Sequence, residues 1–304
     1  MYSFAQLSKG IENPDLAVRE VNALYHTRLR RWDHNKHGVN VLERDWDNLV
    51  LLDACRVDMF RDKNPFAGGS FSTVLSRGSD TVEFLRGNLD GNQYLDTAYV
   101  TASPQLYRLS GDQHGLDIDT ELHDSIEVWE DNWAEDAKTV KPDRLTDAAL
   151  EAAADYPDKR LLVHYMQPHA PFLGPTAREH FDRDSLSFDW RKYRDVPDEL
   201  LWKAYEETLE AALPHVERLV ENLRGKTVLS SDHGQLMGER GFPVPVKLWG
   251  HPRHHYIEEL IRVPWYVPEY EERKTVRAEP KEGSQRAEVD SDIVSSRLEN
   301  LGYK

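Results

Sequence analysis

Residues 227–241, TVLSSDHGQLMGERG, decide the predicted fold. The stretch opens with a short apolar run bounded by two serines, which predicts a short buried strand. Asp232, His233 and Gly234 follow the strand directly. A carboxylate beside an imidazole suits a divalent cation, and ligands bind at the C-terminal edge of open α/β sheets. The alternative is an ordinary turn, since Asp and Gly are common turn residues.

A second buried strand is predicted at residues 48–52, NLVLL, where a continuous apolar run indicates a strand covered on both faces. Asp53 comes directly after it. Its carboxylate is therefore expected at the same edge of the sheet as Asp232. Asp53 could instead cap the following helix.

A hydroxyl group is expected at a helix N-terminus near residue 79. Gly78 marks a turn, and Ser79 then precedes a predicted helix that runs to Leu89. Backbone N–H groups and the helix dipole favour an anion there, which suits a nucleophile that attacks phosphorus or sulfur. A plain helix cap is the other interpretation.

Histidines follow two further predicted segments. The strand predicted at residues 160–167 contains His164 and leads to His169 in the proline-rich run PHAPFLGP. Prolines hold such a loop extended, either to fix an imidazole or only to stiffen a surface loop. His251 follows Gly250 in a later segment.

The order of elements predicts an α/β fold with a mostly parallel central sheet sandwiched by helices. The remaining strands are expected at residues 95–102 and 262–267, and the main helices at residues 145–154 and 197–224. Pro214 is expected to kink or split the second helix.

We predict one catalytic domain over residues 1–268, with an N-terminal helical segment at 1–44. Residues 111–143 are acidic and weakly periodic, which indicates an insertion of loops and short helices with His114 and His123 on the surface. Residues 269–304 are expected to form a charged linker, mobile in its first part, and a short C-terminal helix at 293–301.

Composition excludes several classes of protein. The net charge of −16 argues against nucleic-acid binding, which needs clustered Lys and Arg, and is typical of halophilic proteins. The single cysteine, Cys55, excludes an intrachain disulfide. The sequence contains no apolar run long enough for a membrane span and no signal peptide at its start, so a soluble cytoplasmic protein is expected.

Five segments together resemble the alkaline phosphatase superfamily, in its sulfatase-like branch, and are similar to haloarchaeal sulfatase-like proteins. They are NLVLLDACRVD, SRGSDTVEF, VHYMQPHAPF, VLSSDHGQLMGERG and WGHPRHHYIEELIRVPWYVP, between residues 45 and 268. The resemblance implies an alkaline phosphatase-like fold.

The resemblance also implies roles for single residues. Asp53, Asp232 and His233 match the metal ligands, and His251 matches a histidine that contacts the substrate oxyanion or a second metal. His169 matches a leaving-group contact. Substrate contacts are expected from Arg56, Thr81 and His164.

The nucleophile departs from true sulfatases, which carry Cys-x-Pro-x-Arg and convert the cysteine to formylglycine. Cys55 lacks that context, so it is expected to be a packed residue. The run GSDTVEF instead resembles the Thr-Ser-Asp-Ala-Glu-Phe type of sequence in lipoteichoic-acid-synthase-like and phosphoethanolamine-transferase-like proteins. Alignment on the final Glu-Phe puts the threonine of that motif on Ser79, and Thr81 is the reserve candidate.

The sequence therefore predicts a metal-dependent phosphoester hydrolase or phosphotransferase that acts through Ser79 and a covalent phospho-enzyme. Mn²⁺ or Zn²⁺ fits the expected ligands best, and Ca²⁺ or Mg²⁺ is possible. The expected substrate is a small-molecule, glycan or lipid phosphate (or sulfate) ester. Two alternatives stay open: a sulfatase that lacks formylglycine, and a non-catalytic metal-binding pseudoenzyme, which Gln235 favours because relatives usually have Glu there.

Overall fold

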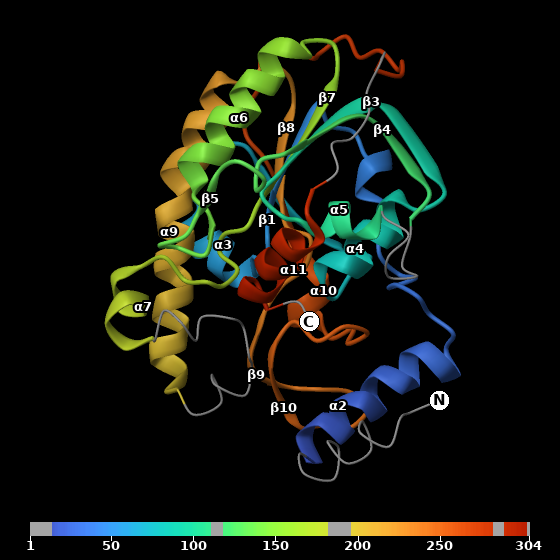
Figure 1. Ribbon diagram of the computed structural model, residues 1–304, viewed down its shortest axis with the longest axis vertical. Helices are drawn as coiled ribbons and strands as arrows, with labels where there is room; N and C mark the ends of the chain where they lie inside the picture. The colour runs from blue at the N-terminus through green and yellow to red at the C-terminus, as the bar shows by residue number, and fades with distance from the viewer. Residues whose placement is uncertain (1–13, 111–117, 182–195, 282–288, 303–304) are drawn as a thin grey trace.

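A seven-stranded sheet forms the centre of the computed structural model, which describes residues 14–110, 118–181, 196–281 and 289–302 (Figure 1). Its strands are β1 (Asn48–Leu52), β2 (Ser70–Leu75), β3 (Asn92–Thr101), β4 (Thr120–Glu127), β7 (Arg160–Tyr165), β8 (Thr227–Ser230) and β11 (Arg262–Val267). Their order across the sheet is β2-β11-β8-β1-β7-β3-β4. The five strands from β8 to β4 are parallel, and β11 runs antiparallel to both of its neighbours. The predicted α/β fold with a mostly parallel sheet is confirmed.

Strand β1 is apolar throughout because both of its faces are covered. Val50 and Leu52 point into one hydrophobic core, and Leu49 and Leu51 point into the other. All of the strand is buried. Successive side chains of a strand point to opposite faces, and here both faces are buried, so every position from Leu49 to Leu52 is apolar. This is the pattern expected for a strand between two helical layers.

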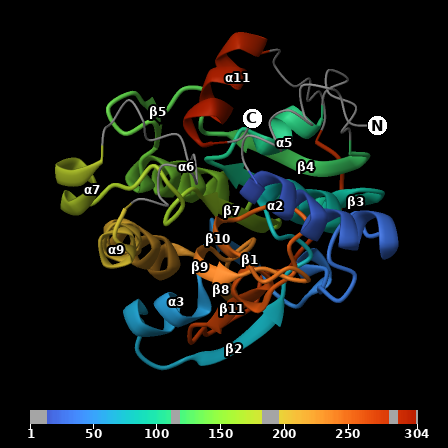
Figure 2. The same ribbon diagram turned by 90° about the horizontal axis from the view of Figure 1, so that it is seen from below.

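Helices cover the two faces unequally (Figures 1 and 2). The first core is shared with α3 (Val57–Lys63), α6 (Pro142–Asp155) and α9 (Asp198–Asn222), and the second with α4 (Thr81–Leu89) and α5 (Gln105–Leu109). Helix α9 continues through Pro214, so the predicted split does not occur. Leu213 and Val216 beside the proline are buried in the first core, and this packing offsets the lost backbone hydrogen bond.

Shorter elements surround these layers. They are α2 (Pro14–Leu24), the π-helix η1 (Tyr25–Leu29), the 3-10 helix η2 (Val41–Glu43), the strand pair β5 (Trp133–Ala134) and β6 (Thr139–Val140), α7 (Pro175–His180), the hairpin β9 (Leu236–Arg240) and β10 (Lys247–Gly250), α10 (Glu258–Ile261) and α11 (Ser291–Asn300). Among the residues that the structure describes, no helix has the length and apolarity that a bilayer crossing requires.

The acidic segment at 111–143 differs from its prediction. Instead of loops and short helices, it supplies β4 to the edge of the main sheet and the small β5–β6 pair. Most residues of β4 are half-buried, so its sequence lacks the apolar run that reveals a central strand. His123, expected on the surface, is buried, and its Nδ1 lies 2.7 Å from the Glu279 carbonyl oxygen. His114 lies outside the described residues.

Residues 269–281, here called the C-terminal strap, cross the N-terminal ends of the central strands at the top of Figure 1. Arg273 donates to Asp47 at 2.7 and 3.0 Å, just before β1 begins. Lys274 donates through Nζ to Asn48 Oδ1 at 2.8 Å. The segment expected to be a mobile linker is therefore tied to the sheet by ion pairs and hydrogen bonds.

Helix α11, which follows the strap, packs against the main body. Val294 and Leu298 on the helix, with Leu301 after it, are buried in the first core. The expected terminal helix is thus present and contributes to that core.

Replacing Arg273 with methionine should lower the free energy of unfolding by about 1–3 kcal/mol at pH 7, because the buried Asp47 carboxylate loses its cation. Burial opposes ionisation of Asp47, but bonds from Arg273 and from the backbone N–H groups of Lys226 and Lys274 hold its pKa below the ordinary 3.8. When folding lowers the pKa of a carboxyl group, the group contributes stability at a pH above its ordinary pKa. That stability is lost as the pH falls through the lowered pKa. Urea unfolding should show the difference at pH 7 and a smaller one below pH 3.8; an equal loss at both would contradict this account.

Candidate metal centre and active site

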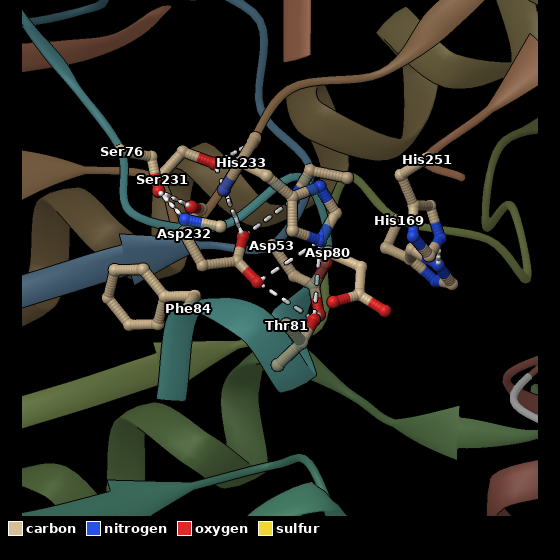
Figure 3. Close-up of polar contacts among 12 residues, drawn as sticks. Asp53, Ser76, Asp80, Thr81, Phe84, His169, Ser231, Asp232, His233 and His251 are labelled. Carbon is tan, nitrogen blue, oxygen red and sulfur yellow. Dashed lines mark hydrogen bonds and ion pairs between the residues drawn. The ribbon is translucent and has the colours of Figure 1, made fainter. Parts of the chain in front are cut away.

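Four buried side chains meet at the C-terminal edge of the sheet. Asp53 follows β1, Asp232 and His233 follow β8, and His164 lies near the end of β7. The three strands are adjacent and parallel, so their ends place these groups together. Thr81, the first residue of α4, faces them from the other side (Figure 3).

The distances in this cluster are short. Thr81 Oγ1 donates to Asp232 Oδ2 at 2.8 Å and lies 3.5 Å from Asp53 Oδ2 and 3.3 Å from His233 Nε2. His233 Nε2 lies 3.3 Å from Asp232 Oδ2 and 3.6 Å from Asp53 Oδ1. His164 Nε2 is 3.7 Å from Asp232 Oδ2 and 3.9 Å from Asp53 Oδ2. All five residues are fully buried.

The cluster holds more hydrogen-bond acceptors than nearby donors. His233 Nδ1 lies 2.8 Å from the Gly234 carbonyl oxygen, so that nitrogen carries the proton and Nε2 turns a lone pair toward the carboxylates. Asp53 Oδ1 and His164 Nε2 have no hydrogen-bond partner in the described part of the chain. Ligand atoms of Asp53, His164 and Asp232 lie within 4.8 Å of one another. Buried acceptors without donors fit a bound cation.

The electrostatics agree with this interpretation. Burial and the negative charge of Asp232 raise the pKa of Asp53 well above its ordinary value. Burial also opposes the charge of Asp232, but His233 and His164 hold its pKa below the ordinary value. Burial lowers the pKa of His164, so the neutral imidazole is favoured. Two carboxylates in a site without water repel each other, and a divalent cation would remove that cost.

Ser79 lies outside this cluster. Its Oγ donates to Glu83 Oε2 at 2.6 Å, and its backbone N–H donates to the same oxygen at 2.9 Å. Glu83 also accepts from Tyr256 Oη at 2.7 Å and contacts His254. Ser79 thus ties the start of α4 to the loop at 252–256, and Thr81 takes the position beside the carboxylates.

The sequence contained a signal for this placement. Asp80 is the N-cap of α4, and its side chain accepts from the Glu83 N–H at 2.8 Å. Asp80 and Glu83 have the spacing of a capping box, which starts the helix at Thr81. The alignment on Glu-Phe did not take that spacing into account, and it therefore predicted Ser79 rather than Thr81 as the nucleophile.

Arg56 is engaged by protein groups. Its guanidinium donates to Asp58 at 2.7 and 2.9 Å, to Glu239 Oε1 at 2.5 Å and to the Gln235 carbonyl oxygen at 3.0 Å. Arg56 would have to leave these partners to make the predicted substrate contact. Cys55 is fully buried and its pKa is raised by burial, which fits the predicted packed residue.

His169 and His251 form an imidazole pair beside the cluster (Figure 3). Their Nε2 atoms are 2.7 Å apart, and the His251 ring stacks on His233 with centroids 4.6 Å apart. His169 Nδ1 donates to the Ala170 carbonyl oxygen, so its Nε2 accepts a proton shared from His251. Burial and the nearby His233 lower the pKa of His169 to about 4.

No family model and no curated protein matches the chain. Among solved structures it is similar to the lipooligosaccharide phosphoethanolamine transferase A of Neisseria meningitidis (15% identity, TM-score 0.43), over 72% of this chain but only 47% of that protein, about half its length. It is also similar to the C-terminal periplasmic domain of EcEptC from Escherichia coli in complex with Zn (12% identity, TM-score 0.43, 75% of each chain). A third match is the phosphonate monoester hydrolase of Agrobacterium radiobacter (11% identity, TM-score 0.41, 72% of this chain and 67% of the other). At this level of similarity, the function proposed below rests on this chain's own residues.

Replacing Asp53 with asparagine should stabilise the protein in the presence of a chelator, because it removes one of two buried like charges. When folding raises the pKa of a carboxyl group, the group contributes stability at a pH below its ordinary pKa. That stability is lost as the pH rises through the raised pKa. At pH 7 we expect the free energy of unfolding to rise by about 1–3 kcal/mol, measured by urea unfolding. A less stable variant in chelator would contradict the proposed repulsion.

Proposed function

We propose that this protein is a metal-dependent phosphoester hydrolase or phosphotransferase in which Thr81 is the nucleophile. The observation that carries the proposal is the Thr81 hydroxyl, which lies 2.8 Å from Asp232 and within 3.5 Å of Asp53 and His233 in a fully buried site. A hydroxyl in that position has both an acceptor for its proton and a place beside a cation. Ser79 has an acceptor for its proton in Glu83, but its hydroxyl does not contact Asp53, Asp232 or His233.

Asp53, His164 and Asp232 would hold the metal, and His233, whose Nε2 lies 3.3 Å from Asp232 and 3.6 Å from Asp53, is the fourth candidate ligand. A divalent cation bound there lowers the pKa of a neighbouring hydroxyl and neutralises charge on phosphoryl oxygens. Two carboxylates with one or two imidazoles favour Zn²⁺ or Mn²⁺ over Ca²⁺ or Mg²⁺. His164 Nδ1 lies 2.8 Å from Tyr99 Oη, and this contact can orient the ring.

Thr81 would attack phosphorus through Oγ1. The new Oγ1–P bond forms as the bond from phosphorus to the leaving oxygen breaks, and the hydroxyl proton passes to Asp232 Oδ2. Thr81 begins α4, so the N-terminal N–H groups of that helix face the phosphoryl oxygens. The result is a phosphothreonine intermediate.

The imidazole pair would supply the leaving-group proton. His251 Nε2–H is shared with His169 Nε2, so the pair holds one mobile proton beside the site. When the pair carries one further proton and is cationic, His251 Nε2 can give its proton to the leaving alkoxide, which leaves two neutral imidazoles. In the second step, water or an acceptor alcohol attacks phosphorus and gives its proton to the pair. The Oγ1–P bond breaks, and Thr81 Oγ1 takes its proton back from Asp232. The substrate class proposed is a small-molecule, glycan or lipid phosphate ester.

Replacing Thr81 with valine, which keeps the shape and removes the hydroxyl, should lower kcat/KM for p-nitrophenyl phosphate by at least about 10³-fold. The matched change Ser79→Ala should cost less than about 10-fold, since it removes contacts with Glu83, Pro252 and His255 but none with the carboxylate cluster. Intact-mass measurement of quenched reactions should show a phosphate adduct in the wild type and in Ser79→Ala, but none in Thr81→Val. An adduct in Thr81→Val that disappears in Ser79→Ala would restore Ser79 as the nucleophile.

Removal of metal should abolish turnover reversibly. EDTA-treated protein should be inactive toward p-nitrophenyl phosphate, bis-p-nitrophenyl phosphate and p-nitrophenyl sulfate, and Mn²⁺ or Zn²⁺ should restore the phosphate reactions. Asp232→Asn should bind neither metal and should not be restored. A preference for the sulfate ester would assign the site to a sulfatase without formylglycine, and metal binding with no turnover of any ester would favour a pseudoenzyme.

A further inference from the structure

We propose that Arg56 and Glu239 form an ion pair that positions the metal centre by joining the loop after β1 to strand β9, which directly follows the loop after β8. Each loop carries ligands of the centre: Asp53 in the first, and Asp232 and His233 in the second. The inference rests on the proposed metal site, and it assigns to Arg56 a positioning role in place of the predicted contact with substrate.

The pair is built around a nearly buried guanidinium. The Arg56 side chain is 9% exposed and that of Glu239 is 24% exposed, with 2.5 Å between Arg56 Nη1 and Glu239 Oε1. Asp58 holds the other edge of the guanidinium through two hydrogen bonds, and the Trp202 ring of α9 lies 4.9 Å from its centre. A planar cation fixed on three sides has one preferred orientation.

The pair connects the loops close to the ligands. Arg56 stands three residues after Asp53, and its Nη1 also donates to the carbonyl oxygen of Gln235, two residues after His233, at 3.0 Å. Glu239 accepts through Oε2 from the Met237 N–H at 2.5 Å, so its carboxylate bridges Arg56 and the backbone at the start of β9.

The first loop needs such support, because Ala54 directly after Asp53 has φ of 60°. A non-glycine residue in the left-handed region is strained and persists only where its surroundings hold it. Ala54 N donates to Asp232 Oδ1 at 3.0 Å, and Cys55 N donates to Ser231 Oγ at 2.9 Å. Ala54, Cys55 and Arg56 thus each contact the segment from Ser231 to Glu239, and Arg56 does so through the ion pair. Tyr205 of α9 also holds this loop, because its hydroxyl contacts the Ala54 carbonyl oxygen and the Arg56 N–H.

The test compares metal affinity with stability. Glu239→Gln keeps the shape of the side chain and removes its charge, and Arg56→Lys keeps the charge and removes the planar fork. Arg273→Met is the matched control, since it breaks an arginine–aspartate pair at the opposite end of β1. Mn²⁺ and Zn²⁺ dissociation constants are measured by titration calorimetry on chelator-treated protein, beside urea unfolding.

We expect both loop variants to bind metal about 10- to 100-fold more weakly, the range seen when groups that orient metal ligands are changed. Arg273→Met should keep the wild-type metal affinity within about twofold although it unfolds more easily. The double variant Arg56→Lys/Glu239→Gln should lose no more affinity than the worse single variant, as expected for two residues that act as one pair.

Two results would overturn the inference. The first is wild-type metal affinity in Glu239→Gln with a stability loss like that of the control, which would make the pair a purely structural contact. The second is wild-type protein that binds neither metal, which would remove the proposed function as well. The first result leaves the metal site intact, so the two failures are distinguishable. Glu239→Gln decides the question if Arg56→Lys does not fold.

Discussion

The structure depends on the placement of two buried carboxylates, Asp53 and Asp232, at the ends of adjacent parallel strands. Neither carboxylate has a lysine or arginine beside it in the described part of the chain, and burial together with the charge of Asp232 raises the pKa of Asp53. A protein keeps such an arrangement at a cost in stability. The surrounding elements create and use this arrangement. Parallel strands bring the two carboxylates together, and helices on both faces of the sheet exclude water from them. Helix α4 places the Thr81 hydroxyl beside them.

Backbone groups complete the site as much as side chains do. Carbonyl oxygens fix the protonation of His233 and His169, so that each turns a lone pair in a defined direction. The backbone N–H of Ala54 binds Asp232 from the other loop. These contacts come from the loops themselves, and they explain why a short glycine-containing motif such as Asp-His-Gly is sufficient to present two ligand groups at a strand end.

The sequence revealed the parts of the fold and the site that local pattern encodes. Residues 48–52 and the strand before Asp232 read as buried strands because their apolar runs are continuous, and the residue after such a strand lies at the ligand-binding edge. The half-buried β4 gave no such run and was missed. Thr81 and Ser79 are two residues apart, and only contacts with residues about 150 positions away decide which hydroxyl lies beside Asp232. Gln235 and Glu239, two partners of Arg56, are similarly distant in the sequence, so local pattern could not reveal them.

The place of β11 in the sheet has a consequence for biosynthesis. Among the described strands, β2 pairs with β11 alone, and β11 also covers the outer edge of β8. Nearly 190 residues separate β2 from β11 in the chain. While the polypeptide emerges from the ribosome, the hydrogen-bonding edges of β2 and β8 stay open until residues 262–267 are made. The sheet is therefore completed only after residues 262–267 have been synthesised, and pairings across such sequence separations form slowly. Until then, a chaperone or a neighbouring nascent chain can bind the open edges of β2 and β8.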